Sequence, residues 1–140
     1  MGASMVHGLL VTHARLGEAF LDAVERITGT TEGLTALSNE SCSADTLRQQ
    51  VDAWLDAIPA ADVAVVFVDL FGGSCSVAAL GASRPRSHVH VVTGVNLAML
   101  LEFLASRTTR PAEEVVARLE DRGKRAILRR SSDTPAGASS

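Results

Sequence analysis

The run Val63-Ala64-Val65-Val66-Phe67-Val68 is the clearest strand signal in the chain, and Asp69 follows it directly. Its residues are apolar without a break and mostly β-branched. Such a run is typical of a parallel strand that is covered on both faces, because none of its side chains has to face water. The sequence therefore predicts a central strand of a parallel sheet with a carboxylate at its end.

Shorter apolar runs lie on either side of this strand and alternate with segments of helical period. The other predicted strands are Val6–Thr12, a weaker Leu34–Leu37, His88–Thr93 and a short Ala126–Leu128. The predicted helices are Leu16–Ile27 ending at Gly29, a segment capped by Ser43 that closes at Pro59, a small-residue helix ending near Ala82, Leu97–Ser106, and Ala112–Gly123.

The alternation of strands and helices predicts a doubly wound α/β fold with a mostly parallel sheet of order 2-1-3-4 and helices on both faces. In such sheets a ligand site lies outside the carboxyl ends of the strands, where the strand order reverses. Here that point is between the first and third strands. We expect one domain over residues 1–128, and a disordered tail over 129–140 because Ser131–Ser140 is rich in Ser, Ala, Gly and Pro.

Composition excludes several classes of function. The 140 residues are 46% hydrophobic, carry a formal net charge of −3 and include 4% aromatic residues without any Tyr. A nucleic-acid partner is therefore not expected. Cys42 and Cys75 form no metal-type or redox-type spacing, so we expect a reduced, cytoplasmic protein with neither metal nor cofactor. With no apolar run of about 18 residues, we expect a soluble chain that does not insert into a membrane.

His13 and Asp69 end the first and third predicted strands, so both belong to the edge where the site is expected. A carboxylate that bonds one ring nitrogen of a histidine fixes the tautomer and leaves the other nitrogen as a nucleophile. The same charge stabilises the cationic ring that forms when the histidine takes up a phosphoryl group. We therefore place a candidate catalytic pair at His13 and Asp69.

Gly72, Gly73 and Ser74 lie beside this pair at a predicted helix N-terminus, where backbone N–H groups can receive phosphate oxygens. Taken singly, a strand-end His, a turn Asp and a Gly-Gly-Ser turn are each more often structural than functional. Their conjunction at one switch point favours a site. His7, His88 and His90 are interpreted as structural or surface residues, and Cys75 as a small packing residue.

Three segments resemble the mannose-family enzyme IIA of the phosphoenolpyruvate-dependent sugar phosphotransferase system (PTS). They are Gly8-Leu9-Leu10-Val11-Thr12-His13, Phe67-Val68-Asp69-Leu70-Phe71-Gly72-Gly73-Ser74 and Thr93-Gly94-Val95-Asn96-Leu97-Ala98-Met99-Leu100. Their order and spacing match over roughly the first 128 residues. The second and third segments are both distinctive, so together they are a strong signal.

The resemblance implies a function and a residue for each role. It implies a phosphotransferase that carries a phosphoryl group on His13 with Asp69 as its partner, and a phosphate-holding loop at Gly72, Gly73 and Ser74. Phe71 would face partner proteins. Arg15, which departs from the family pattern, adds a positive charge beside the site and is also predicted to face partners. The implied donor is the phosphocarrier HPr and the implied acceptor an enzyme IIB. The family also forms homodimers by exchanging a C-terminal strand, for which Ala126–Leu128 is the candidate.

The chain departs from the family pattern at several positions around the site. Ala14 stands where the family usually has Gly, Gly17 where it usually has Ala, and Cys75 where Pro usually follows Gly-Gly-Ser. Ala98 replaces a Pro that often precedes Met. Three other functions stay open: a regulatory module controlled by phosphorylation of His13, a phosphocarrier that serves dihydroxyacetone kinase, and a flavodoxin-like small-molecule binder without phosphotransfer.

Overall fold

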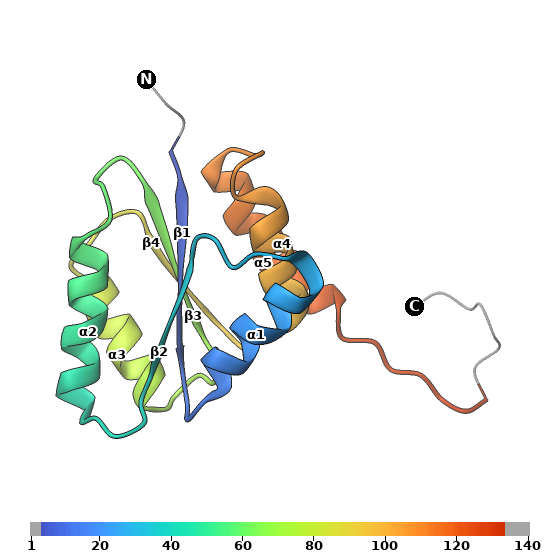
Figure 1. Cartoon of the computed structure of the whole chain (residues 1–140), viewed down its shortest axis with the longest axis horizontal. Coiled ribbons are helices and arrows are strands. Elements are labelled where there is room, and N and C mark those ends of the chain that lie inside the picture. Colours follow the sequence, from blue (N-terminus) through green and yellow to red (C-terminus); the bar gives the residue numbers. More distant parts are fainter. Residues whose placement is uncertain (1–3, 134–140) are drawn as a thin grey trace.

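The computed structural model describes residues 4–133 and shows an open parallel sheet between two layers of helices (Figure 1). The strands are β1 (Val6–Thr12), β2 (Leu34–Ser38), β3 (Val63–Val68) and β4 (Val89–Thr93). The helices are α1 (Leu16–Thr28), α2 (Ala44–Asp56), α3 (Ser74–Ser83), α4 (Leu97–Ser106) and α5 (Ala112–Arg125). Within the described residues, no helix is both long enough and apolar enough to cross a membrane.

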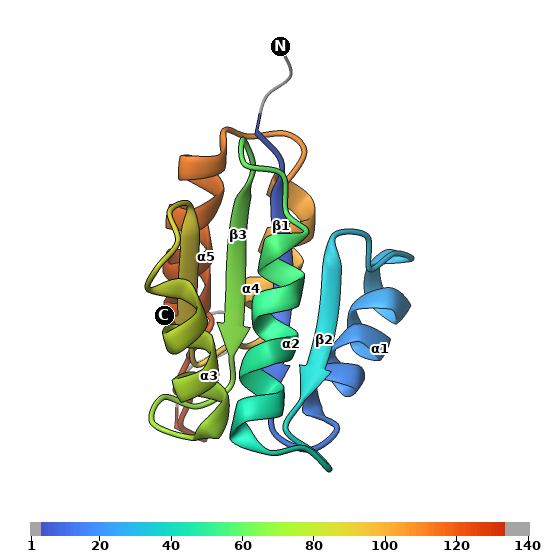
Figure 2. The ribbon, with the colours of Figure 1, turned by 90° about the vertical axis from the view of Figure 1, so that its left-hand side faces the viewer.

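The sheet has the order β2-β1-β3-β4 with every neighbouring pair parallel, which confirms the predicted 2-1-3-4 topology. The strand order reverses between β1 and β3, and there Val11 is in register with Val68. Figure 2 shows α2 and α3 in front of the sheet, on the face opposite α4 and α5. The doubly wound α/β prediction is therefore confirmed.

The two faces of the sheet bury separate apolar clusters, which explains why the central strands are apolar without alternation. Leu10 and Phe67 point toward the layer of α1, α4 and α5, and Phe103 of α4 meets Phe67 edge-on with ring centroids 5.5 Å apart. Val11 and Val68 point toward α2 and α3. Because successive side chains in a strand alternate between faces, one run fills both cores.

Local signals end or begin several helices where the sequence predicts. Gly29 closes α1 in the left-handed conformation, with φ at 84°. Ser43 caps α2, and its side chain accepts a hydrogen bond from the Thr46 N–H at 3.1 Å. Asn96 caps α4 in the same way by accepting from the Met99 N–H. These local signals set the residues at which α1 ends and at which α2 and α4 begin.

The predicted strand Ala126–Leu128 is wrong for the single chain. Helix α5 runs to Arg125, and the Ala126 N–H still donates to the Arg122 carbonyl. Between Ala126 and Asp133, where the described chain ends, no residue belongs to a strand, and Ile127 is 79% exposed. A strand needs a neighbouring strand with which to form backbone hydrogen bonds. The exchange of Ala126–Leu128 into a second chain therefore stays a prediction. Residues 134–140 of the expected disordered tail lie outside the described residues.

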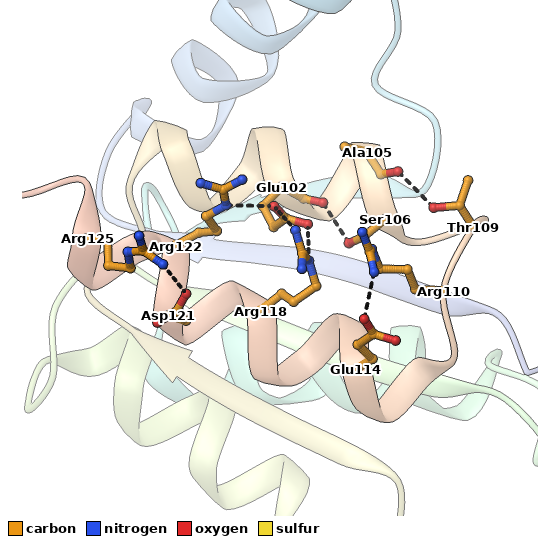
Figure 3. A network of polar contacts seen from close by, with 10 residues as sticks. All are labelled: Glu102, Ala105, Ser106, Thr109, Arg110, Glu114, Arg118, Asp121, Arg122 and Arg125. Carbon is orange, nitrogen blue, oxygen red and sulfur yellow. Dashed lines mark hydrogen bonds and ion pairs between the residues drawn. The ribbon is translucent and has the colours of Figure 1, made fainter.

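A buried carboxylate joins α4 to α5 (Figure 3). Glu102 is a charged residue on the otherwise apolar face of α4, and it accepts hydrogen bonds from Arg118 at 2.9 Å and from Arg122 at 3.1 Å. The hydrogen bond from Arg118 is the main cause that lowers the pKa of Glu102 below its ordinary value of 4.5. The pair of arginines thus compensates the burial of the charge.

We expect Glu102→Gln to lower the free energy of unfolding at neutral pH by roughly 1–3 kcal/mol, because two arginines lose their charged partner. The folded-state pKa of Glu102 lies below the unfolded one. Its contribution is therefore full above about pH 4.5 and is lost as the pH falls through the folded-state value. Urea unfolding of both chains across this range measures the difference.

The matched control is Glu120→Gln, which breaks an exposed pair with Lys124. Surface pairs of this kind contribute little, so the control should unfold like the unmodified chain. Equal losses for the two variants, or a Glu102→Gln effect that persists at low pH, would contradict the role of the buried carboxylate.

Candidate functional site

The parallel register of β1 and β3 brings His13 and Asp69 together. Val11 pairs with Val68, so the next turns of the chain leave the sheet side by side at its carboxyl edge. The His13 backbone N–H donates to Asp69 Oδ2 at 3.0 Å, and His13 Nδ1 lies 3.0 Å from Oδ2 and 3.1 Å from Oδ1. One carboxylate therefore holds both the backbone and the ring of the histidine.

The geometry of this pair selects one tautomer of the imidazole. An ionised carboxylate only accepts hydrogen bonds, so we assign the ring proton of neutral His13 to Nδ1. Nε2 then carries the free lone pair. The Asp69 side chain is 12% exposed and that of His13 is 38% exposed, so the orienting group is covered while the ring reaches solvent. This arrangement suits a nucleophile that meets its substrate at the surface.

A glycine turn lies against the free side of the ring. Gly72 has φ at 97°, which favours glycine, and Gly73 leads into α3. A Cβ on Gly73 would lie 3.1 Å from His13 Nε2 and 3.1 Å from Cε1. No side chain caps the N-terminus of α3, so its first N–H groups are available to an anion beside Nε2.

Asn39 is a site residue that the sequence reasoning missed. It follows β2, and its Oδ1 accepts from the Ala14 N–H at 3.0 Å while its Nδ2 donates to Ser74 Oγ at 3.3 Å. It thereby ties the turn after His13 to the glycine turn. Its position directly after a predicted strand of the same sheet edge was the available signal.

Ala14 occupies a strained backbone conformation next to the histidine. Its φ is +49°, in the left-handed region where a side chain costs roughly 1–2 kcal/mol. The resemblance predicts Gly at this position, and the angle supplies the physical reason. Asn39 holds its N–H and Ser38 Oγ donates to its carbonyl, so the surrounding contacts fix the strained turn.

The surface around His13 is apolar and open. Phe71 is 71% exposed, and Leu70 and Val77 beside it are also exposed. Arg15 extends into solvent and pairs with Glu18 at 3.4 Å. A hollow of about 620 Å³ lies elsewhere, against His88 and His90 near the amino ends of the strands, and the His13 site does not line it.

His7 lies away from the His13–Asp69 pair, whereas Cys75 is buried close to it. His7 bonds Asp62 at 2.8 Å near the other end of β1, which fits its interpretation as a structural residue. Cys75 is fully buried in the first turn of α3 and packs in the core, as expected of a small packing residue. Burial raises the pKa of the Cys75 thiol to about 11, and the nearby charge of Asp69 adds to this effect.

The fold and site define an α/β protein with an imidazole–carboxylate pair at the switch point of a parallel sheet. Residues 8–120 match the family model EIIA-man, described as the PTS system fructose IIA component, and the chain belongs to this family. It is 29% identical over 118 residues to the PTS system mannose-specific EIIAB component of Escherichia coli K12. That match covers 83% of this chain and 36% of the relative, so the chain spans about a third of its length.

Solved structures share the fold. The phosphotransferase system component EIIA from Streptococcus agalactiae superposes with a TM-score of 0.81 at 22% identity, over 89% of this chain and 97% of that one. The mannose/sorbose-specific IIA subunit from Enterococcus faecalis gives a TM-score of 0.74 at 24% identity, over 96% and 99%. These likenesses show the architecture that positions His13 and Asp69.

We expect Gly73→Ala and Gly72→Ala to act differently on the site. The added Cβ at Gly73 meets the ring and should shift or tilt His13, whereas at Gly72 nothing lies within 4 Å of it. Gly72→Ala should instead cost roughly 1–2 kcal/mol of stability through its positive φ. Nuclear magnetic resonance of the His13 ring, together with urea unfolding, measures both effects. Unchanged ring resonances in Gly73→Ala would contradict the contact.

Proposed function

We propose that this chain is a phosphocarrier of the sugar phosphotransferase system that accepts a phosphoryl group on His13 Nε2. The observation that carries the proposal is the hydrogen bond between His13 Nδ1 and Asp69, which leaves Nε2 free beside the uncapped end of α3. The family match and the mannose-specific relative support the phosphotransferase class.

The chemistry of acceptance follows from this geometry. Nε2 attacks the phosphorus of a donor phosphohistidine, the new N–P bond forms as the donor N–P bond breaks, and the donor ring leaves as neutral imidazole. His13 becomes cationic, because both ring nitrogens are now substituted, and the Asp69 carboxylate faces the Nδ1–H. The N–H groups of α3 and the Ser74 hydroxyl offset the charge on the transferring oxygens. The chain's own groups carry out these roles, and no proton has to move.

Both substrates of such a carrier are proteins, and the surface supports this. The His13 side chain is 38% exposed, and exposed Leu70 and Phe71 follow its partner Asp69 while exposed Arg15 follows His13 in the chain. We propose HPr as the donor and an enzyme IIB-type protein as the acceptor, in the cytoplasm. The relative's name joins an A and a B component, which supports a B-type acceptor. Encounters through a small apolar patch are expected to be weak and transient.

We also propose a homodimer in which residues 126–128 of each chain pair with the sheet of the other. Support comes from Ile127 and Leu128, two large apolar residues that follow α5 and are exposed in the single chain. The resemblance gives the same expectation.

Incubation with phosphoenolpyruvate, enzyme I and HPr should place an acid-labile, alkali-stable phosphate on His13, located by mass spectrometry under neutral conditions. His13→Ala should abolish the label. His7→Ala is the matched control, because His7 also pairs with an aspartate but lies near the opposite end of β1. Labelling that survives in His13→Ala would overturn the proposed carrier residue.

Asp69→Asn should slow phosphoryl transfer by roughly 10²–10⁴-fold while the chain stays folded. An amide N–H can donate to Nδ1, which moves the ring proton to Nε2 and blocks the nucleophile. Single-turnover transfer from phosphorylated HPr measures the rate, and circular dichroism checks the fold. A rate near that of the unmodified chain would contradict the orienting role of Asp69.

Two truncations test the dimer. Removal of residues 131–140 should leave a dimer in analytical ultracentrifugation, because Ile127 and Leu128 remain. Removal of residues 126–140 should give a monomer. A monomeric unmodified chain, or a dimer that survives the longer truncation, would show that these residues do not hold two chains together.

A further inference from the structure

Three side chains of metal-ligand type meet at the carboxyl edge of the sheet. One ring nitrogen of His13, one oxygen of Asp69 and the Cys75 sulfur all lie within 4.8 Å of one another. They come from the ends of β1 and β3 and from the first turn of α3. No metal site was predicted from the sequence, because residues this far apart in the chain form no recognisable ligand spacing.

The set matches a particular class of cation. Imidazole nitrogen, carboxylate oxygen and thiolate sulfur are the ligands of Zn²⁺ and similar borderline-soft divalent ions, whereas Ca²⁺ and Mg²⁺ prefer oxygen alone. Ligand atoms around tetrahedral zinc lie about 3.3–3.8 Å apart, so a contraction of about 1 Å would close the set on an ion. Closure on an ion requires a shift of the half-buried His13 ring or of the glycine turn that leads into Cys75.

Three protein ligands would leave a fourth coordination position on the ion open. Cys75 and Asp69 lie on the covered side, and His13 lies at the surface, so a fourth ligand comes from solvent. The Asp69 charge faces the ion. The thiol stands where the resembled family usually has Pro, a residue without a ligand atom, so the third ligand is a property of this chain.

We propose that this chain binds Zn²⁺, or a divalent cation of the same class, through His13, Asp69 and Cys75. Binding replaces the thiol proton, so Cys–SH and the ion give the bound thiolate and one released H⁺, and no oxidant or reductant is needed. An ion at this site either occupies Nε2 or replaces the Nδ1–H contact with Asp69, so it opposes phosphoryl acceptance on His13. Only this last consequence rests on the proposed function.

Cobalt(II) reports the ligands directly. Titration of the full, reduced chain with Co²⁺ should produce a near-ultraviolet band from charge transfer between thiolate and cobalt, and Zn²⁺ should displace it. Cys75→Ala should lose the band. His13→Ala and Asp69→Asn should keep a thiolate ligand but bind Co²⁺ at least about tenfold more weakly. Cys42→Ser is the matched control and should behave as the unmodified chain.

The outcomes separate this site from the carrier function. Absence of the band in the unmodified chain, its survival in Cys75→Ala, its loss in Cys42→Ser, or unweakened binding in both His13→Ala and Asp69→Asn would each overturn the site. Circular dichroism of every variant checks the fold. If Cys75→Ala does not fold, the weaker Co²⁺ binding of His13→Ala still tests the site, because the His13 side chain is not part of the core. No phosphoryl donor is present, so failure here leaves the labelling of His13 unaffected.

Discussion

The pairing of β1 with β3 is the constraint on which the site depends. Their parallel register sets Val11 opposite Val68, so a histidine and an aspartate that are far apart in the sequence leave the sheet side by side. The Asp69 carboxylate then receives both the backbone N–H and the ring Nδ1 of His13. A shift of the β1–β3 register by one residue would turn the buried side chains of one strand toward the wrong core. Packing on both faces of the sheet therefore maintains the contact between His13 and Asp69.

The packed strands support turns at the carboxyl edge of the sheet that contain a strained backbone and exposed apolar side chains. Ala14 holds a left-handed φ because Asn39 and Ser38 satisfy its backbone groups, and these residues stand on the end of β2. Phe71 is exposed only three residues after β3, in which every residue after Val63 is buried. The apolar cores stabilise the fold, whereas the turns at the carboxyl edge hold the candidate site and the exposed side chains proposed to meet partners.

The sequence was most informative where one local pattern dominates. The apolar run Val63–Val68 and the cap at Ser43 predict elements that the structure confirms, and the ends of the strands place His13 and Asp69 at one edge. Asn39 was missed because its two hydrogen bonds join turns that meet only in the folded sheet. Residues 126–128 have a strand-like composition, but strand formation depends on a neighbour that the sequence does not specify.

The site balances two opposite charges around one imidazole. The uncapped N–H groups of α3 favour an anion beside Nε2, whereas the Asp69 carboxylate and the sulfur of Cys75 favour a cation near the same ring. In an enzyme IIA with proline after Gly-Gly-Ser, only the first preference has a full set of groups. With cysteine at this position, the proposed phosphoryl acceptor and the proposed metal ligand are the same side chain, and the charge that the surroundings supply decides which of the two binds.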